Sequence, residues 1–286
     1  MRSRLPSWFR QALPPAASGG RVKQLLGQLG LHTVCEGARC PNRAACWHDS
    51  AAAFLILGNV CTRDCRFCAI PHEARPAPPD PGEPARLAEA AAAMGLRHVV
   101  VTSVTRDDLP DGGAAHFAAT IREIRSRIPG AAVEVLIPDF QGDPAALAAV
   151  LAAQPDILNH NLETVARLQP VVRPQADYAR SLAVLRRAAD AGARTKSGLM
   201  LGMGETAAEI RAALRDLRAA GVTLLTLGQY LAPSAAHHPV ARFVPPAEFD
   251  GWRAEALALG FATVAAAPHV RSSYHADELA AAGGRP

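Results

Sequence analysis

The chain has 286 residues, of which 49% are hydrophobic and 20% are charged, and its formal net charge is +4. These values are ordinary for a globular enzyme, so they exclude a disordered chain or a fibrous repeat, and the scattered arginines argue against a nucleic-acid-binding face. Apolar runs such as residues 51–57 are far shorter than the roughly 20 residues that cross a bilayer, and no apolar signal core follows Met1, so we expect a cytoplasmic protein that binds neither membrane nor nucleic acid.

The predicted elements form an N-terminal arm and a parallel α/β body. Residues 1–34 are rich in Pro, Gly and Arg, with one short helical stretch. After them, short apolar runs alternate with longer stretches of helical period, which is typical of βα units. We predict strands at residues 54–60, 98–104, 132–138, 157–161, 195–201 and 224–230, and helices at 84–94, 113–127, 144–153, 176–191, 206–219 and 246–259. Six such units without a dinucleotide-binding glycine motif favour a partial (β/α)6 TIM-like barrel over a doubly wound sheet.

Unusual residues follow the predicted strands, where barrel enzymes place their working groups. Cys61 follows the first strand and residues 103–108 follow the second. Residues 161–163 lie at the end of the fourth, and residues 202–205 follow the fifth. We therefore expect a functional site at the carboxyl ends of the strands.

All six cysteines lie within residues 35–68, in two triplets: Cys35, Cys40 and Cys46, then Cys61, Cys65 and Cys68. Disulfides are typical of small secreted chains, and a closed zinc site needs four ligands, so each triplet is one ligand short. Both interpretations stay open at this point. Three thiolates in one loop favour a cubane iron-sulfur cluster whose fourth iron is open for chemistry.

The second triplet has the spacing of a known superfamily. Residues 61–68 read CTRDCRFC, and this CxxxCxxC pattern after the first strand of a βα body resembles the motif of radical S-adenosylmethionine (SAM) enzymes. The resemblance implies that Cys61, Cys65 and Cys68 bind a [4Fe-4S] cluster, and that SAM chelates its open iron. Reduction of SAM to methionine and a 5′-deoxyadenosyl radical calls for a cluster of low potential.

The first triplet and the C-terminus resemble one family within this superfamily. Residues 35–47, CEGARCPNRAACW, are similar to the auxiliary-cluster motif of lipoyl synthases, and residues 271–276, RSSYHA, are similar to its C-terminal motif. By residue chemistry alone, an Arg-Ser-Ser run is a surface turn. The resemblance implies instead that Ser273 is the fourth ligand of a second [4Fe-4S] cluster held by Cys35, Cys40 and Cys46. A hard alkoxide ligand leaves readily, which suits a cluster that gives up sulfur.

The resemblance covers roughly residues 5–280, with further matches at 101–109, 159–164, 195–206 and 228–231. It implies a radical SAM partial barrel at residues 51–262. N-terminal and C-terminal extensions, residues 1–50 and 263–286, would carry the auxiliary iron-sulfur cluster.

Several residues depart from the family pattern near the implied clusters. Gly37 and Ala45 stand where glutamates are usual, Ala51 and Ala53 lie in a stretch that is usually Gly-Thr-Ala-Thr, and Ala267 stands where glycine is common. These departures leave open whether substrate or turnover is altered. They motivate one alternative, a diverged paralogue acting on another acyl substrate. A non-catalytic iron-sulfur or zinc-binding module is an alternative of a different class.

The resemblance also implies contacts to SAM, each with a structural alternative. Asn161 and Glu163 are candidates for the ribose hydroxyls, or else for a strand-end cap and a solvated acid. Thr102 and Ser103 are candidates for the amino group, or else ordinary turn hydroxyls. Cations that pair with the carboxylate, and glycines that let the backbone approach SAM, complete the candidate set: Arg173, Lys196, Gly198 and Gly202.

The implied reaction inserts two sulfur atoms at C6 and C8 of a protein-bound octanoyl-lysine, with sulfur taken from the auxiliary cluster. Such C–H bonds are too inert for acid-base chemistry, so a radical cofactor is needed. The implied partners are the octanoylated lipoyl domain of a 2-oxoacid dehydrogenase subunit or a glycine cleavage H protein, a ferredoxin or flavodoxin-type reductant, and an iron-sulfur carrier for cluster repair. The acceptor preference, the reductant, the oligomeric state and the mode of cluster regeneration do not follow from the sequence.

Overall fold

The structure is a computed structural model that describes residues 5–10, 20–49 and 51–282. Its centre is an eight-stranded sheet in which the strands follow in chain order from β1 to β8. β1 (His32–Thr33) pairs antiparallel to β2. The remaining strands are parallel: β2 (Ala53–Ile56), β3 (His98–Ser103), β4 (Ala132–Leu136), β5 (Ile157–Asn159), β6 (Thr195–Leu201), β7 (Leu224–Gln229) and β8 (Thr263–Ala266).

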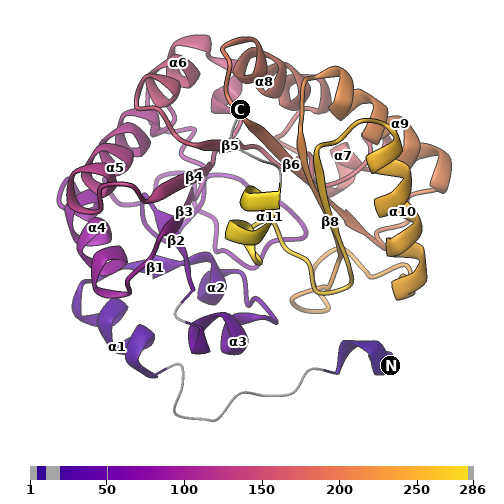
Figure 1. Ribbon diagram of the computed structural model, residues 1–286, viewed down its shortest axis with the longest axis horizontal. Coiled ribbons are helices and arrows are strands. Elements are labelled where there is room, and N and C mark those ends of the chain that lie inside the picture. The colour runs from indigo at the N-terminus through magenta and orange to yellow at the C-terminus, as the bar shows by residue number, and fades with distance from the viewer. Residues whose placement is uncertain (1–4, 11–19, 50, 283–286) are drawn as a thin grey trace.

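Six helices surround the curved sheet on its outer face (Figure 1). They are α4 (Glu83–Ala93), α5 (Ala114–Arg127), α6 (Pro144–Ala152), α8 (Tyr178–Asp190), α9 (Ala207–Ala219) and α10 (Pro246–Ala258). Their apolar faces pack on the strands in two buried clusters, one centred on β2–β5 and one on β6–β8. Local chemistry fixes the helix ends. Thr206 and Glu209, for example, form a capping box at the start of α9.

The shorter elements lie at the ends of the barrel and in its connections. They are α1 (Gly20–Gln28), α2 (Val34–Gly37), α3 (Arg43–His48), α7 (Gln169–Val172), α11 (Ala276–Ala282), and the 3-10 helices η1 (Ser7–Phe9), η2 (Phe140–Gly142) and η3 (Ala166–Leu168). α11 contacts β3 and β8 and lies in front of the ring of strands in Figure 1. Arg194, just before β6, donates from Nη2 to the carbonyl of Ala280 at 2.7 Å. This bond holds α11 at the amino ends of the strands.

The predicted fold is confirmed as an α/β partial barrel, with two strands more than expected. All six predicted strands and all six predicted helices are present. The predicted strand at 54–60 ends at Ile56, because Leu57 adopts a left-handed conformation (φ 67°) and its N–H donates to Glu83 Oε2 at 2.8 Å. Within the described chain, β1 and β8 are the two edges of the sheet, so the barrel stays open.

None of the helices in the described part of the chain combines the length and the apolar character that a membrane span requires.

Candidate functional site

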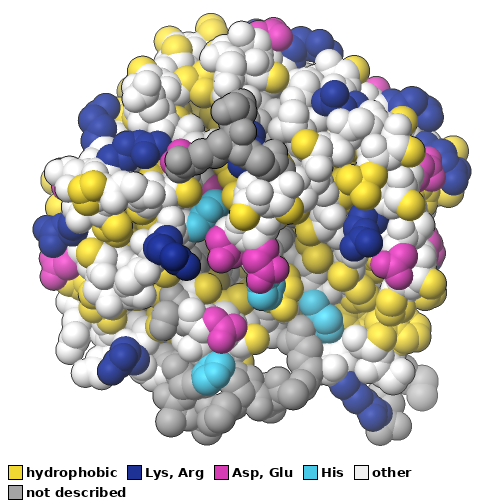
Figure 2. Space-filling model, viewed as in Figure 1, with side chains coloured by type: hydrophobic (Ala, Val, Ile, Leu, Met, Phe, Trp, Pro, Cys, Tyr) yellow, Lys and Arg dark blue, Asp and Glu magenta, His cyan; other side chains and the backbone are white. Residues whose placement is uncertain are grey.

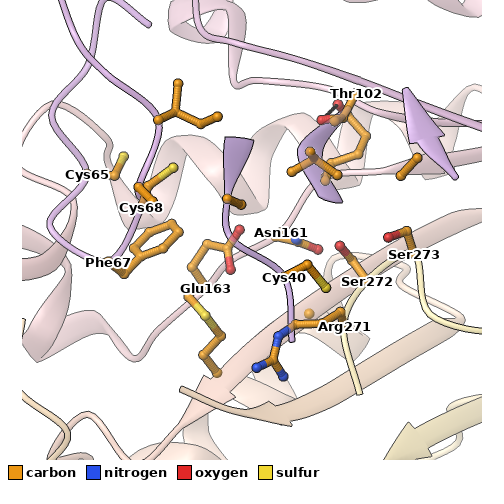
Figure 3. Close-up of a pocket in the computed structure, with 18 of the residues that line it drawn as sticks. Cys40, Cys65, Phe67, Cys68, Thr102, Asn161, Glu163, Arg271, Ser272 and Ser273 are labelled. Atoms are coloured by element: carbon orange, nitrogen blue, oxygen red, sulfur yellow. Dashed lines mark hydrogen bonds between the residues drawn. The ribbon is translucent and has the colours of Figure 1, made fainter. Parts of the chain in front are cut away.

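A cavity of about 480 Å³ lies inside the curved sheet, toward the carboxyl ends of its strands. Cysteines of both triplets line it, together with the C-terminal motif: Cys35, Cys40, Cys61, Cys65, Cys68 and Ser273. In Figure 3, Cys65 and Cys68 lie on one side, and Cys40 with Ser273 on the other. Segments separated by some 200 residues of chain therefore open onto one space.

The loop of the second triplet is held in place by backbone hydrogen bonds. The N–H of Thr62 donates to the carbonyl of Thr105 at 2.9 Å, and that of Arg66 donates to Val172 at 2.8 Å. The sulfur of Cys61 accepts from the backbone N–H of Arg63 and of Thr105, at 3.4 and 3.3 Å. Such bonds to sulfur are one means by which a protein tunes an iron-sulfur cluster.

A buried charge network ties the same loop to the barrel. Arg63, whose side chain is 3% exposed, binds Asp107 and Asp139, with closest distances of 2.6 Å in both pairs. The side chain of Asp139 is fully buried, and it also accepts from Arg180 at 3.4 Å. Burial alone would raise the pKa of Asp139, but hydrogen bonds from Arg63 outweigh it and lower the pKa to about 2. The network therefore fixes Arg63 between the cysteine loop and the segments that follow β3 and β4.

Burial changes the acidity of four of the six thiols. Burial raises the pKa of Cys46 and of Cys68 to about 12, and it raises the pKa of Cys35 and Cys65 as well. Metal binding must therefore displace protons from these sulfurs. The described residues contain no group of three or more His, Cys, Asp or Glu side chains that converges on a single metal ion. A cubane differs in this respect, because each cysteine binds a different iron.

The auxiliary side is assembled from α2, α3 and the C-terminal segment. Thr33 caps α2, which carries Cys35, and α3 carries Cys46. Asn42 Nδ2 donates to the carbonyl of His269 at 2.7 Å and so ties the cysteine loop to the segment that leads to Ser273. This hydrogen bond is one direct contact between residues that lie more than 200 positions apart in sequence.

Gly228 in β7 permits the close approach of that C-terminal segment. A Cβ atom at this position would lie 2.0 Å from the carbonyl oxygen of Val270, so no larger residue fits without moving the backbone. Gly37, one of the departures from the family pattern, is less constrained: its Cβ would lie 2.4 Å from Ile70 Cδ1, the end of a flexible side chain that can move aside.

Polar groups without partners face the middle of the cavity. Ser103 Oγ, Asn161 Oδ1 and Arg173 Nε are buried and have no hydrogen-bond partner among the described residues. Glu163 lies between the two cysteine groups (Figure 3), and burial raises its pKa. Its backbone is left-handed (φ 69°), a strained conformation that is common at functional sites. A polar ligand with donors and acceptors would satisfy these atoms.

Four other candidate residues divide into two that line the cavity and two that do not. Thr102 and Gly198 line it, although the Thr102 hydroxyl already donates to Leu136 at 3.0 Å. Lys196 does not line it: the ammonium is fully buried and pairs with Glu134 at 2.7 Å, near the amino end of β6. Gly202 also lies outside, where a Cβ would meet Gln229 Nε2 at 2.2 Å. The structure therefore places Lys196 and Gly202 away from this cavity and does not bring them together with the other candidate residues.

Sequence reasoning missed several residues of this site. Arg63 and Arg271 are embedded in recognised motifs, but their partners could not be read from spacing. Arg271 lines the cavity beside Cys40 (Figure 3), and burial lowers its pKa. His237 Nε2 lies 3.0 Å from the carbonyl oxygen of Cys68. The HH dipeptide at 237–238 was the only available signal for that contact.

His160 predicts a pH dependence of stability. Its ring is fully buried between the carbonyl of Ile137 and the hydroxyl of Ser181, and burial lowers its pKa to about 4. The unfolded chain takes up a proton below pH ~6.5, whereas the folded chain does so only near pH 4. Stability is therefore lost as pH falls through this window, by about 3 kcal/mol for this group.

Urea unfolding of the wild type and of His160→Gln at several pH values checks this dependence. The variant should lose less stability than the wild type between about pH 6.5 and 4. Parallel curves for the two proteins would contradict the assignment.

Two family models match the chain. The radical SAM superfamily matches residues 55–217, and the N-terminal domain of lipoyl synthase matches residues 1–40. A lipoyl synthase from Methylococcus capsulatus is 58% identical over 99% of this chain and 88% of its own length. One from Chlorobaculum parvum is 56% identical over 95% of this chain and 94% of its own length.

Solved structures of low identity share the fold. The [FeFe]-hydrogenase maturase HydG has a TM-score of 0.58 at 16% identity, covering 95% of this chain and 67% of its own. Streptococcus suis SuiB bound to S-adenosylmethionine has a TM-score of 0.56 at 9% identity, covering 76% and 50%. The identity to the curated relatives extends over nearly the whole chain. This chain therefore belongs to the lipoyl synthase family of the radical SAM superfamily.

Proposed function

We propose that the cavity is the place where the two halves of the lipoyl synthase reaction meet. In this proposal Cys61, Cys65 and Cys68 hold the radical [4Fe-4S] cluster. A second [4Fe-4S] cluster is held by Cys35, Cys40, Cys46 and Ser273. The observation that carries the proposal is that cysteines of both triplets and Ser273 line one cavity. A carbon radical made at one end of that space has the sulfur donor at the other.

The residues between the triplets fit SAM. Ser103 and Asn161 offer unpaired oxygen atoms for its amino and hydroxyl hydrogens, and Glu163 offers a carboxylate close by. Arg173 offers an unpaired N–H for its carboxylate. The Cβ that Gly198 lacks would lie 3.1 Å from Asn161 Oδ1, so glycine keeps this space open.

When bound, the clusters supply the electron that cleaves SAM and the sulfur that enters the product. The chain's own residues position these groups and exclude water. Apolar side chains such as Leu55, Val100 and Leu136 line the same cavity and suit an octanoyl chain. Reaction at C6 and C8 then needs the chain to lie between the triplets, so that each carbon in turn reaches both radical and sulfur.

The partners follow from this chemistry. A lipoyl synthase acts on an octanoyl group carried by an acceptor protein. We propose as acceptor the lipoyl domain of a 2-oxoacid dehydrogenase subunit or a glycine cleavage H protein. A ferredoxin or flavodoxin would supply electrons, and an iron-sulfur carrier would restore the second cluster. The cytoplasm is the proposed location, because six cysteines kept for metal need a reducing compartment.

In the same proposal the chain has three parts. Residues 1–50 carry the auxiliary cysteine motif, residues 51–262 form the radical SAM barrel, and residues 263–286 carry the RSSY motif. β8 lies in the last of these, and through it the C-terminal motif is anchored to the sheet.

Reductive incubation of the anaerobically reconstituted protein with SAM and an octanoyl-lysine peptide tests the function. Deoxyadenosine and thiolated peptide are followed together, and both are expected. Deoxyadenosine without thiolated peptide would favour a diverged paralogue that acts on another acyl substrate. The departures from the family pattern at Ala45 and Ala53 suggest this alternative. Reconstitution that yields neither deoxyadenosine nor more than one cluster would favour a non-catalytic module.

Gly198→Ala is expected to weaken SAM binding about tenfold. The added methyl group would displace the Asn161 side chain, which would then lose roughly one hydrogen bond between uncharged groups to the ligand. The added methyl would lie 2.5 Å from Thr226 Oγ1 as well. The measurement is the SAM concentration that gives half-maximal deoxyadenosine formation. Gly251→Ala, with nothing within 4 Å, is the matched control and should leave this value unchanged. Equal values for both variants would exclude Gly198 from the SAM site.

A further inference from the structure

A second cavity, of about 1230 Å³, lies toward the amino ends of the strands, whereas the first cavity lies toward their carboxyl ends. The turns before β3, β5 and β6 form one wall, and α11 with the segment before it forms another. This volume exceeds the ~300–1,000 Å³ of a fitted small-molecule pocket. The amino-terminal face of a barrel normally serves stability rather than function. A cavity of this size there is therefore unexpected.

The second cavity reaches the residues of the proposed auxiliary cluster. Cys35, Cys46 and Ser273 line it. Cys35 and Ser273 line the first cavity as well, as do Ala53 and Val100, whereas Cys46 lines only the second. The auxiliary site therefore lies between the two cavities, and Cys46, one of its proposed ligands, lines only the second.

The outer part of this cavity carries carboxylates and imidazoles. Asp49, Asp277 and Glu278 are exposed and line it, so it reaches the surface. Figure 2 shows acidic and histidine side chains near the middle of the face that carries α11. Asp49 lies three residues after Cys46 and Glu278 five residues after Ser273, and all four line this cavity, which places the acidic rim close to the cluster ligands. Four carboxylates line the cavity, Asp156 included, against the guanidinium groups of Arg97 and Arg194, so anionic oxygen donors predominate and favour ferrous iron over anions.

We propose that the second cavity is the passage through which hydrated ferrous iron reaches and leaves the auxiliary site. This inference rests on the proposed second cluster. A cluster that gives up sulfide cannot keep its iron in a closed cubane, so iron must leave and return. The first cavity is filled by SAM and the octanoyl chain during turnover. A separate opening at the amino ends of the strands lets iron exchange without crossing the substrate.

The passage is tested by iron release from a chain that holds only the auxiliary cluster. The background variant is Cys61→Ala with Cys65→Ala and Cys68→Ala, reconstituted anaerobically, and the probe is excess EDTA. Ala281 lines the cavity on α11 and is exposed, whereas Ala282, on the same helix, is exposed and does not line it. Ala281→Trp is therefore the blocking change, and Ala282→Trp is its control.

Ala281→Trp is expected to slow iron release several-fold while total iron stays the same, and Ala282→Trp should release iron at the background rate. Ala193→Phe narrows the passage from the opposite wall and should act in the same direction. Equal release rates in blocked and control variants would overturn the passage and leave the proposed function intact. Failure of the background variant to hold any cluster would overturn the proposed auxiliary site, and the passage with it.

Discussion

Cys40→Ala is expected to abolish the lipoyl product while deoxyadenosine formation continues. Cys40 lines the cavity on the side of Ser273, whereas Cys65 and Cys68 lie on the other side. Loss of a metal ligand should exceed the ~10–100-fold effect typical of outer-shell changes. Iron content should fall from about eight to about four atoms per chain, since one of two cubanes is lost. The two products and the iron are measured on one anaerobic preparation.

Two further variants make this result specific. Cys68→Ala should give the opposite pattern, because without the radical cluster neither deoxyadenosine nor product forms. Ser273→Ala should lower product formation, whereas Ser272→Ala, a neighbouring serine that also lines the cavity, should have little effect. Normal thiolation by Cys40→Ala would show that the sulfur comes from elsewhere. An equal loss in Ser272→Ala and Ser273→Ala would remove the special role of Ser273.

Periodicity predicted the body of the fold because long amphipathic helices and buried strands follow the side-chain period closely. It failed where few residues form an element. β1 has only two residues, and its pairing with β2 depends on how the N-terminal arm returns to the sheet. β8 has four residues, Thr263–Ala266, in an alanine-rich stretch with no clear alternation. Neither element carries enough local signal to be separated from a loop.

The site was predictable where a ligand pattern is local and not where partners come from distant strands. The cysteine spacings are local, and the cavity brings five of the six together. Lys196 looked like a free cation because the sequence does not show that Glu134, on β4, lies 2.7 Å away. A buried charge must be paired, so the partner decides whether it is available to a ligand. The pairing of Arg63 with Asp107 and Asp139 could not be predicted for the same reason, because both carboxylates lie far from Arg63 in the sequence.

Asp139→Asn is expected to destabilise the fold by about 3 kcal/mol, because it leaves Arg63 with an incompletely compensated buried charge. Asp139 accepts from Arg63 at 3.0 and 2.6 Å, and its side chain is fully buried. Asp107→Asn is the matched control: Asp107 binds the same guanidinium but is 28% exposed, so its loss should cost clearly less. Urea unfolding of the metal-free, reduced chain measures both. Equal urea midpoints for the two variants would contradict the special role of the buried Asp139 in fixing Arg63.

The same substitution separates positioning of the radical loop from general stability. Arg63 lies between Cys61 and Cys65. A weakened ion pair with Asp139 should therefore lower the iron of the radical cluster and deoxyadenosine formation even where the chain stays folded. Among the described residues no hydrogen bond or ion pair joins Arg63, Asp107 or Asp139 to the auxiliary cysteines, so the auxiliary site should keep its iron, the reverse of the pattern for Cys40→Ala. The contribution of Asp139 is present above pH ~3.8 and is lost as pH falls toward 2, because its folded pKa lies below the unfolded value. In Asp139→Asn that acid-dependent loss of stability should disappear. If the substitution acted only on folding, both iron sites would be depleted equally.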